Sequence, residues 1–136
     1  MRFHIQTSPS ASEPHMTVGI GRDESFQVVV QEDAFLSEVF VTSATLLDVT
    51  GGYEIKVSFD RKGTWIFEQI TTAHKNRRIA VFCQFGNTRW LAAPVIQKRV
   101  SDGEFTFTPD ATREEAERIV RGLMNVASEV RKHNDG

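Results

Sequence analysis

The side chains best suited to chemistry are scattered along this sequence. The four histidines show neither a His-x₃-His nor a Glu-x-x-His spacing, either of which would place two ligands on one face of a helix. They are His4, His15, His74 and His133. We therefore predict ordinary surface histidines and no metal site.

Cys83 is the only cysteine, so the chain can form neither an internal disulfide nor a multi-cysteine zinc site. It alternates with Ile79, Val81 and Phe85 in a segment typical of a strand. A catalytic thiol needs a nearby histidine and a polar setting, whereas a core thiol is inert. The pattern favours burial.

Other catalytic signatures are also missing. No serine lies in a Gly-x-Ser-x-Gly elbow, no glycine-rich phosphate loop occurs, and Gly19-Ile20-Gly21 is only a fragment of a dinucleotide fingerprint. Asp102, Glu104 and Asp110 are close in sequence, but turns and helix caps ordinarily use such residues. We predict that the protein is not an enzyme and binds no cofactor.

Two tryptophans could instead contribute to a binding surface. Trp is rarely fully buried, and exposed aromatic patches often mark interaction sites, although core packing is the commoner role for Trp65 in a helical stripe and for Trp90 in a strand. Pro94 donates no ladder hydrogen bond, which favours a sheet edge or a bulge there. The candidate binding residues are therefore Trp90, Leu91, Pro94 and Trp65.

Strands with one buried and one wet face are expected to position these residues. Residues 53–59 alternate apolar and polar side chains most cleanly, after a hairpin turn at Gly51-Gly52. Further strands are predicted at residues 2–6, 17–20, 25–31, 78–85, 90–100 and 104–108. Residues 35–49 fit neither the helical nor the strand period.

Two amphipathic helices complete the pattern, at residues 62–75 and 112–132. Thr112 followed by Glu115 is a capping-box pattern at the start of the second helix. We predict an α+β domain in which an antiparallel sheet carries both helices on one face. We expect residues 1–136 to form one domain, with N-terminal strands and a loop in residues 1–34.

Composition sets the class of partner. Sixteen Lys and Arg against eighteen Asp and Glu give a net charge of −2, which disfavours nucleic acid. No stretch is apolar enough to span a bilayer, and the first residues lack the apolar region of a signal peptide. A lipid anchor on a longer precursor remains open.

Residues 55–126 resemble the head subdomain of the first periplasmic domain of SecD, a component of the Sec protein-export machinery. Five features carry the resemblance: Val57-Ser58-Phe59-Asp60 with Gly63-Thr64; Thr71-Thr72; Arg77-Arg78-Ile79-Ala80-Val81; Ala92-Ala93-Pro94-Val95-Ile96 with Ser101-Asp102-Gly103; and Ala111-Thr112-Arg113-Glu114-Glu115-Ala116 leading to Gly122-Leu123. Phe35-Leu36 through Ser43-Ala44 resembles the preceding segment, so the similar region is taken as residues 35–132.

The resemblance implies a binding or docking module in the periplasm or cell envelope that contacts polypeptide or an envelope protein partner and has no active site. The transmembrane helices and the membrane-embedded aspartate of SecD have no counterpart in this sequence, so proton-coupled export is not carried over. We expect a free-standing or lipoprotein-borne relative. A small-ligand-binding regulatory domain and a structural oligomerisation domain are the alternatives.

Overall fold

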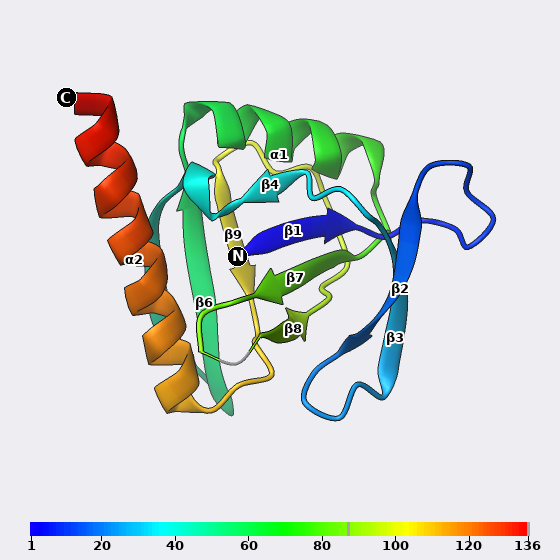
Figure 1. The fold of residues 1–136 in the computed structure, drawn as a ribbon, viewed down its shortest axis with the longest axis horizontal. Coiled ribbons are helices and arrows are strands. Elements are labelled where there is room, and N and C mark those ends of the chain that lie inside the picture. Colours follow the sequence, from blue (N-terminus) through cyan, green and yellow to red (C-terminus); the bar gives the residue numbers. More distant parts are fainter. Residues whose placement is uncertain (87, 136) are drawn as a thin grey trace.

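The computed structural model describes residues 1–86 and 88–135, which form two sheets and two principal helices (Figure 1). The strands are β1 (Arg2–Ile5), β2 (His15–Ile20), β3 (Phe26–Gln31), β4 (Leu36–Ser37), β5 (Val41–Val49), β6 (Gly52–Phe59), β7 (Ile79–Cys83), β8 (Arg89–Ala92) and β9 (Glu104–Phe107). The helices are α1 (Arg61–Ala73), α2 (Arg113–Asp135) and a 3₁₀ turn, Glu38–Phe40.

The first sheet has six strands in the order β3-β2-β8-β7-β1-β4. Its pairings are antiparallel except that of β2 with β8, which is parallel and brings Ile20 beside Trp90. Beyond β1 the chain turns back onto β3, because Gln6 bridges Val30 and the amide of Thr7 donates to the carbonyl of Val29 at 2.9 Å. Strands β1, β7, β8, β2 and β3 therefore close into a ring.

The second sheet has three antiparallel strands in the order β5-β6-β9. Ala44, Val57 and Phe105 lie opposite one another on neighbouring strands, and so do Leu46, Ile55 and Phe107. Residues at directly paired positions share a face of the sheet, so these side chains form one apolar face. That face is the floor of the main core.

Both helices pack on this apolar face. The ring of Phe67 in α1 lies 5.3 Å from that of Phe59 and 5.4 Å from that of Phe105, measured between centroids. Helix α2 runs beside β5 and β6 (Figure 1) and buries Ala116, Ile119 and Leu123. The first sheet reaches the same core through Phe3, whose ring lies 5.6 Å from that of Phe59.

Local capping explains where the helices begin. The carboxylate of Asp60 accepts from the amide of Gly63 at 2.7 Å, which caps α1. At α2 the predicted capping box is confirmed: the Thr112 hydroxyl accepts from the Glu115 amide at 3.2 Å, and the Glu115 carboxylate accepts from the Thr112 amide at 3.4 Å.

The α+β class with two principal helices is confirmed, and the structure adds that the strands divide into two sheets. The segment after β8 pairs with the chain ahead of β7, whereas β9 pairs with β6. These two segments are close in sequence but belong to different sheets, which alternation of apolar side chains cannot distinguish. The ambiguous residues 35–49 form β4, the 3₁₀ turn and the long strand β5.

Candidate functional site

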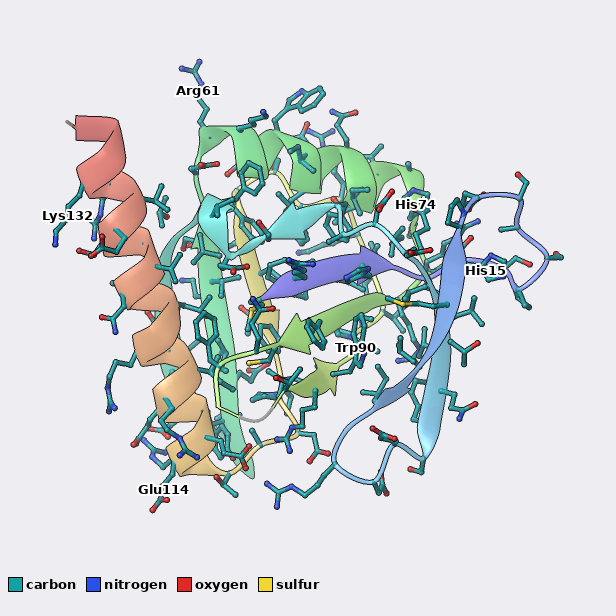
Figure 2. All side chains as sticks on the ribbon, in the orientation of Figure 1. His15, Arg61, His74, Trp90, Glu114 and Lys132 are labelled. Carbon is teal, nitrogen blue, oxygen red and sulfur yellow. The ribbon has the colours of Figure 1, made fainter. Side chains whose placement is uncertain are left out.

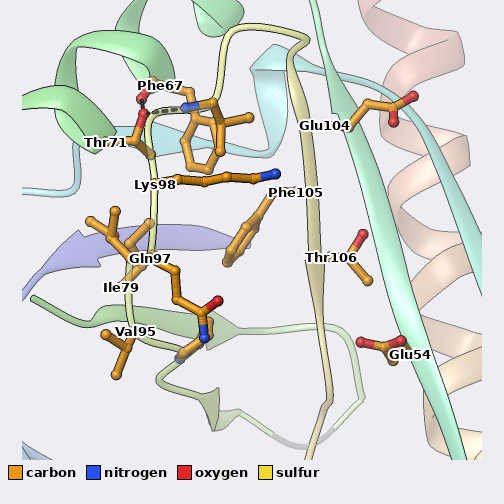
Figure 3. A pocket seen from close by; sticks show the side chains of 13 residues that line it. Glu54, Phe67, Thr71, Ile79, Val95, Gln97, Lys98, Glu104, Phe105 and Thr106 are labelled. Carbon is orange, nitrogen blue, oxygen red and sulfur yellow. Dashed lines mark hydrogen bonds between the residues drawn. The ribbon is translucent and has the colours of Figure 1, made fainter. Parts of the chain in front are cut away.

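A groove lies between the segment that follows Pro94 and strand β9 (Figure 3). Its volume is about 420 Å³. The lining residues come from three places: the segment of residues 94–100, β9 with Glu54 of the neighbouring strand, and Phe67, Thr71 and Ile79 beneath. The groove therefore lies where the two sheets separate.

Strand β9 is the edge of its sheet, and its pairing determines which backbone groups are left over. The amide of Phe59 donates to the carbonyl of Gly103 at 2.8 Å, which makes these two residues a hydrogen-bonded pair. Such pairs alternate along an antiparallel ladder, so Phe105 and Phe107 also bond to β6 while Glu104 and Thr106 direct their backbone groups outward. The amide of Glu104 accordingly donates to the Asp102 carboxylate at 3.0 Å.

Three backbone groups of β9 then face the free edge: the carbonyl of Glu104 and both the amide and the carbonyl of Thr106. None of the three has a backbone hydrogen-bond partner among residues 1–86 and 88–135. Because an exposed edge of this kind is a template for another strand, β9 can accept one.

The opposite wall has the same character. The carbonyl of Pro94 accepts from the amide of Ile79 at 2.9 Å, and the amide of Ile96 donates to the carbonyl of Arg77 at 2.8 Å. Val95 lies between these two bonds and bridges Arg78 in a non-hydrogen-bonded position, so its own amide and carbonyl point away from residues 77–79. The Val95 side chain is 40% exposed.

The floor of the groove is apolar, and hydrogen bonds hold the chain in place at both of its ends. Phe67, Ile79 and Phe105 are buried beneath it. At one end the Thr71 hydroxyl accepts from the Val100 amide at 2.9 Å and donates to the Phe67 carbonyl at 3.0 Å. Toward the other end a second pocket of about 510 Å³ shares Pro94, and the amide of Asp110 donates to the carbonyl of Leu91 at 2.9 Å.

The rim of the groove carries both signs of charge. Lys98 is exposed, and its side chain reaches from its own segment toward β9 (Figure 3). Across the groove, Glu54 and Glu104 line the other side, and Glu104 pairs with Lys56 at 3.3 Å. An occupant of the groove therefore meets apolar side chains below and charges of both signs at the rim.

Of the four candidate binding residues, Leu91 and Pro94 line a common pocket, whereas Trp90 and Trp65 line neither pocket. Pro94 lines both pockets, and Leu91, although only 2% exposed, lines the second. Trp90 lies among the strands that close into a ring (Figure 2). The centroid of its indole is 5.0 Å from the centroids of the His4 and Phe82 side-chain rings. Trp65 is 63% exposed on the outer side of α1, so the core role expected from the helical stripe is wrong for it.

Strand β8, which holds Trp90 and Leu91, is also no sheet edge, because it lies between β2 and β7. The free edge near Pro94 is at the next residue, Val95. The groove residues Val95, Gln97, Phe105 and Thr106 were not singled out from the sequence, because nothing in their types distinguishes a free edge from a paired strand.

Burial of Cys83, which the sequence favours, is confirmed. Cys83 is fully buried, and burial raises the pKa of its thiol, so the thiol stays protonated. His4 is buried as well, so the surface position expected for it is wrong; desolvation lowers its pKa, against the opposing effect of its hydrogen bond to the Gln31 carbonyl. Within the described parts of the chain, no group of three or more His, Cys, Asp and Glu residues could hold a metal ion.

A cluster of charged side chains lies at the start of α2. Arg89 pairs with Glu115 at 3.0 Å while both are largely buried, and Arg22 contacts the same carboxylate. The amide of Arg22 also donates to the Asp110 carboxylate at 2.7 Å. The cluster joins the end of β2, the start of β8 and the first turn of α2, which is a structural role.

No helix in the described residues is both long and apolar enough to cross a membrane.

Comparison with known proteins gives a consistent result for sequence and fold. The family described as the SecDF P1 head subdomain matches residues 15–125. The protein translocase subunit SecD of Calditerrivibrio nitroreducens is 31% identical over 93 residues, which is 67% of this chain and 17% of that protein. The chain thus spans about a sixth of this curated relative.

Two solved structures share the fold. One, described as a membrane component SecDF that enhances protein export, superposes with a TM-score of 0.66 at 17% identity and covers 90% of this chain and 60% of its own. The other, SecDF in a super-membrane-facing form, gives a TM-score of 0.66 at 18% identity, and the match covers 90% of this chain and 18% of that chain.

Proposed function

Since the chain belongs to the SecDF P1 head subdomain family, we propose that it is a non-catalytic module of the cell envelope that binds extended polypeptide in the course of protein translocation. SecD and SecDF, to which it is similar, are described as a translocase subunit and as a component that enhances protein export. Membership of this family supports a role in protein translocation, and the groove supports an extended polypeptide as the ligand.

The observation that carries this proposal is the groove between residues 94–100 and β9. It combines an apolar floor, made by Phe67, Ile79 and Phe105, with unpaired backbone groups on its walls. An unfolded chain offers the same two things, apolar side chains and backbone amides, whatever its sequence. A site that uses both can accept many different polypeptides.

Site-specific photocrosslinking tests the proposal. A photoreactive residue at position 95 should crosslink to a reduced and alkylated, permanently unfolded model protein, because Val95 lines the groove. The same substitution at Val49 is the control, since it is also a valine with 40% exposure but lies in the β5–β6 hairpin, outside the pocket lining. Equal yields at both positions, or no yield at 95, would contradict the proposal.

A small-ligand regulatory function is the second candidate, and the volume of the groove favours it, since small-molecule sites usually measure about 300–1,000 Å³. The exposed Val95, Gln97 and Lys98 count against it, because they leave the groove open along one side. A small ligand that raises the melting temperature and abolishes the crosslink at position 95 would favour this second function.

We also propose that the protein works in the periplasm or cell envelope. Fractionation of the cells that make it, followed by sequencing of the mature protein, provides the test. Recovery from the envelope fraction is the expected result. Recovery from the cytoplasm alone would leave the family and the fold unchanged and would exclude an extracytoplasmic role.

A further inference from the structure

We infer that the polypeptide enters the groove as an added β-strand, paired with the free edge of β9 and recognised mainly through its backbone. This inference rests on the proposed function and adds how the ligand is bound and which class of sequence is accepted. The accepted ligand is an extended segment with apolar side chains at alternate positions. The residues between them need not be ones that disfavour a helix.

The hydrogen-bonding groups of β9 support this mode. The carbonyls of Glu104 and Thr106 can accept two amides of an incoming strand, and the amide of Thr106 can donate to one of its carbonyls. The amide of Glu104 is already held by Asp102, so pairing beyond it is blocked at that end. The edge therefore offers three bonds in one fixed register.

The surroundings of β9 define the side chains that fit. In a strand, successive side chains point to opposite faces, so an added strand directs every second one onto the floor of Phe67, Ile79 and Phe105. The remaining side chains face the rim, where Lys98 lies on one side and Glu54 and Glu104 on the other. A segment with neutral polar residues at those positions fits both signs of charge.

The arrangement of residues 91–110 explains why this edge is free. These residues form two extended segments joined by the turn at Ser101, Asp102 and Gly103, yet the two segments do not pair with each other along β9. The Asp110 amide and the Leu91 carbonyl hold them together only at the far end. A strand between them would join the two sheets.

The probe is the peptide Lys-Thr-Val-Thr-Val-Thr-Val-Thr-Lys, measured by fluorescence anisotropy against the whole chain. Two analogues carry ester links in place of alternate backbone amides, one in each phase, which removes hydrogen-bond donors and leaves the side chains unchanged. Pairing with a single edge uses the donors of one phase only. Loss of two hydrogen bonds should weaken binding about 20-fold in that phase, and the other analogue should bind within twofold of the parent.

A variant of the protein tests the same edge from the other side. Thr106→Pro removes the outward amide of β9 but no bond to β6, so proline is tolerated there as on other edge strands. It should weaken peptide binding about fivefold, while Thr106→Val, which keeps the amide, should not. Circular dichroism of both variants establishes whether they are folded. The ester peptides test the same pairing on the unaltered protein, so the test does not depend on the folding of either variant.

The outcomes separate this inference from the proposed function. If the unfolded protein crosslinks at position 95 but both ester peptides bind as tightly as the parent, or lose affinity equally, the ligand is a polypeptide that is not added as a strand to β9. If neither polypeptide nor peptide binds, both proposals fail. If the chain instead dimerises in analytical ultracentrifugation and Thr106→Pro abolishes the dimer, the occupant is a second copy and the inference is overturned.

Discussion

Trp65 and Trp90 show how little a residue type says about its role. Trp65 projects from α1 into solvent, whereas Trp90 makes an edge contact with His4 and a tilted contact with Phe82 among the strands that close into a ring. The sequence allowed either role for both, because α1 offers two adjacent apolar residues, Trp65 and Ile66, and its true inward stripe includes the small residues Gly63 and Thr71. Small residues at a tight helix contact hide the phase of the stripe.

Replacing the two tryptophans with alanine should therefore give different results. Trp65→Ala should change the free energy of unfolding by less than about 0.5 kcal/mol, because an exposed side chain loses few contacts. Trp90→Ala should lower it by about 3 kcal/mol through lost aromatic packing. Urea unfolding followed by circular dichroism measures both. Similar losses in the two variants would show that the outer side of α1 is covered in solution.

His4 makes stability depend on pH. Burial lowers its pKa, so the folded chain binds a proton there less readily than the unfolded chain, whose histidine titrates near 6.5. The stabilisation is therefore complete above that pH and is lost as the pH falls below it. Arg2 lowers this pKa further, whereas the Gln31 carbonyl and Asp33 raise it. The pKa of His74 is also lowered, by burial and by the positive charge of Arg77.

The urea midpoint of the protein should accordingly fall between pH 7.5 and pH 5. His4→Phe keeps an aromatic ring beside Trp90 and should reduce this dependence, and His74→Gln measures the part that His74 contributes. An unchanged pH dependence in His4→Phe would assign the effect to other groups.

At the scale of the elements, short-range rules worked and long-range pairing was beyond reach. The Thr112 capping box, the hairpin near Gly51 and the alternating strand β6 depend on neighbours in sequence, and the structure has all three. The turn of the hairpin is Thr50-Gly51 and not Gly51-Gly52, because Gly52 already pairs with Val49. The division into two sheets depends on which distant strand each segment meets. The groove exists because of that division, so its residues could not be predicted from their own types.

Gly122 allows α2 to lie close to the segment after β7. A Cβ atom at this position would come within 2.5 Å of the Phe85 ring. Gly122→Ala should therefore lower stability by about 1 kcal/mol despite the higher helix propensity of alanine. Combining it with Phe85→Leu should recover part of the loss, which a double-mutant cycle measures as favourable coupling. Additive effects would mean that Phe85 moves aside freely.

At the scale of the whole molecule, two hydrophobic clusters share one sheet. The larger contains Phe3, Phe59 and Phe105 from both sheets, and the smaller contains Val18, Val28 and Ala93 inside the ring of strands. Strands β1 and β7 contribute to both, since Phe3 and Val81 face the larger cluster while His4 and Ala80 face the other way. Loss of β1 or β7 would therefore disrupt both clusters at once.

The chain should therefore unfold in one cooperative step. In Trp65→Phe, the remaining Trp90 reports on the smaller cluster by fluorescence, and far-ultraviolet circular dichroism reports on the helices of the larger one. Coincident urea transitions are expected for a domain of this size. An earlier fluorescence transition would show that the β2–β3 hairpin and its cluster separate first.

The place of β1 between β7 and β4 in the first sheet has a consequence for the time course of synthesis. Its partner β7 lies 74 positions later, with Ile5 paired to Ile79. At translation rates of about 5–20 residues per second, β1 waits roughly 4–15 seconds for this partner. Throughout that interval Phe3 and Ile5 lack their partners Val81 and Ile79. The nascent chain is then itself an extended, partly apolar polypeptide of the kind that its finished groove is proposed to hold.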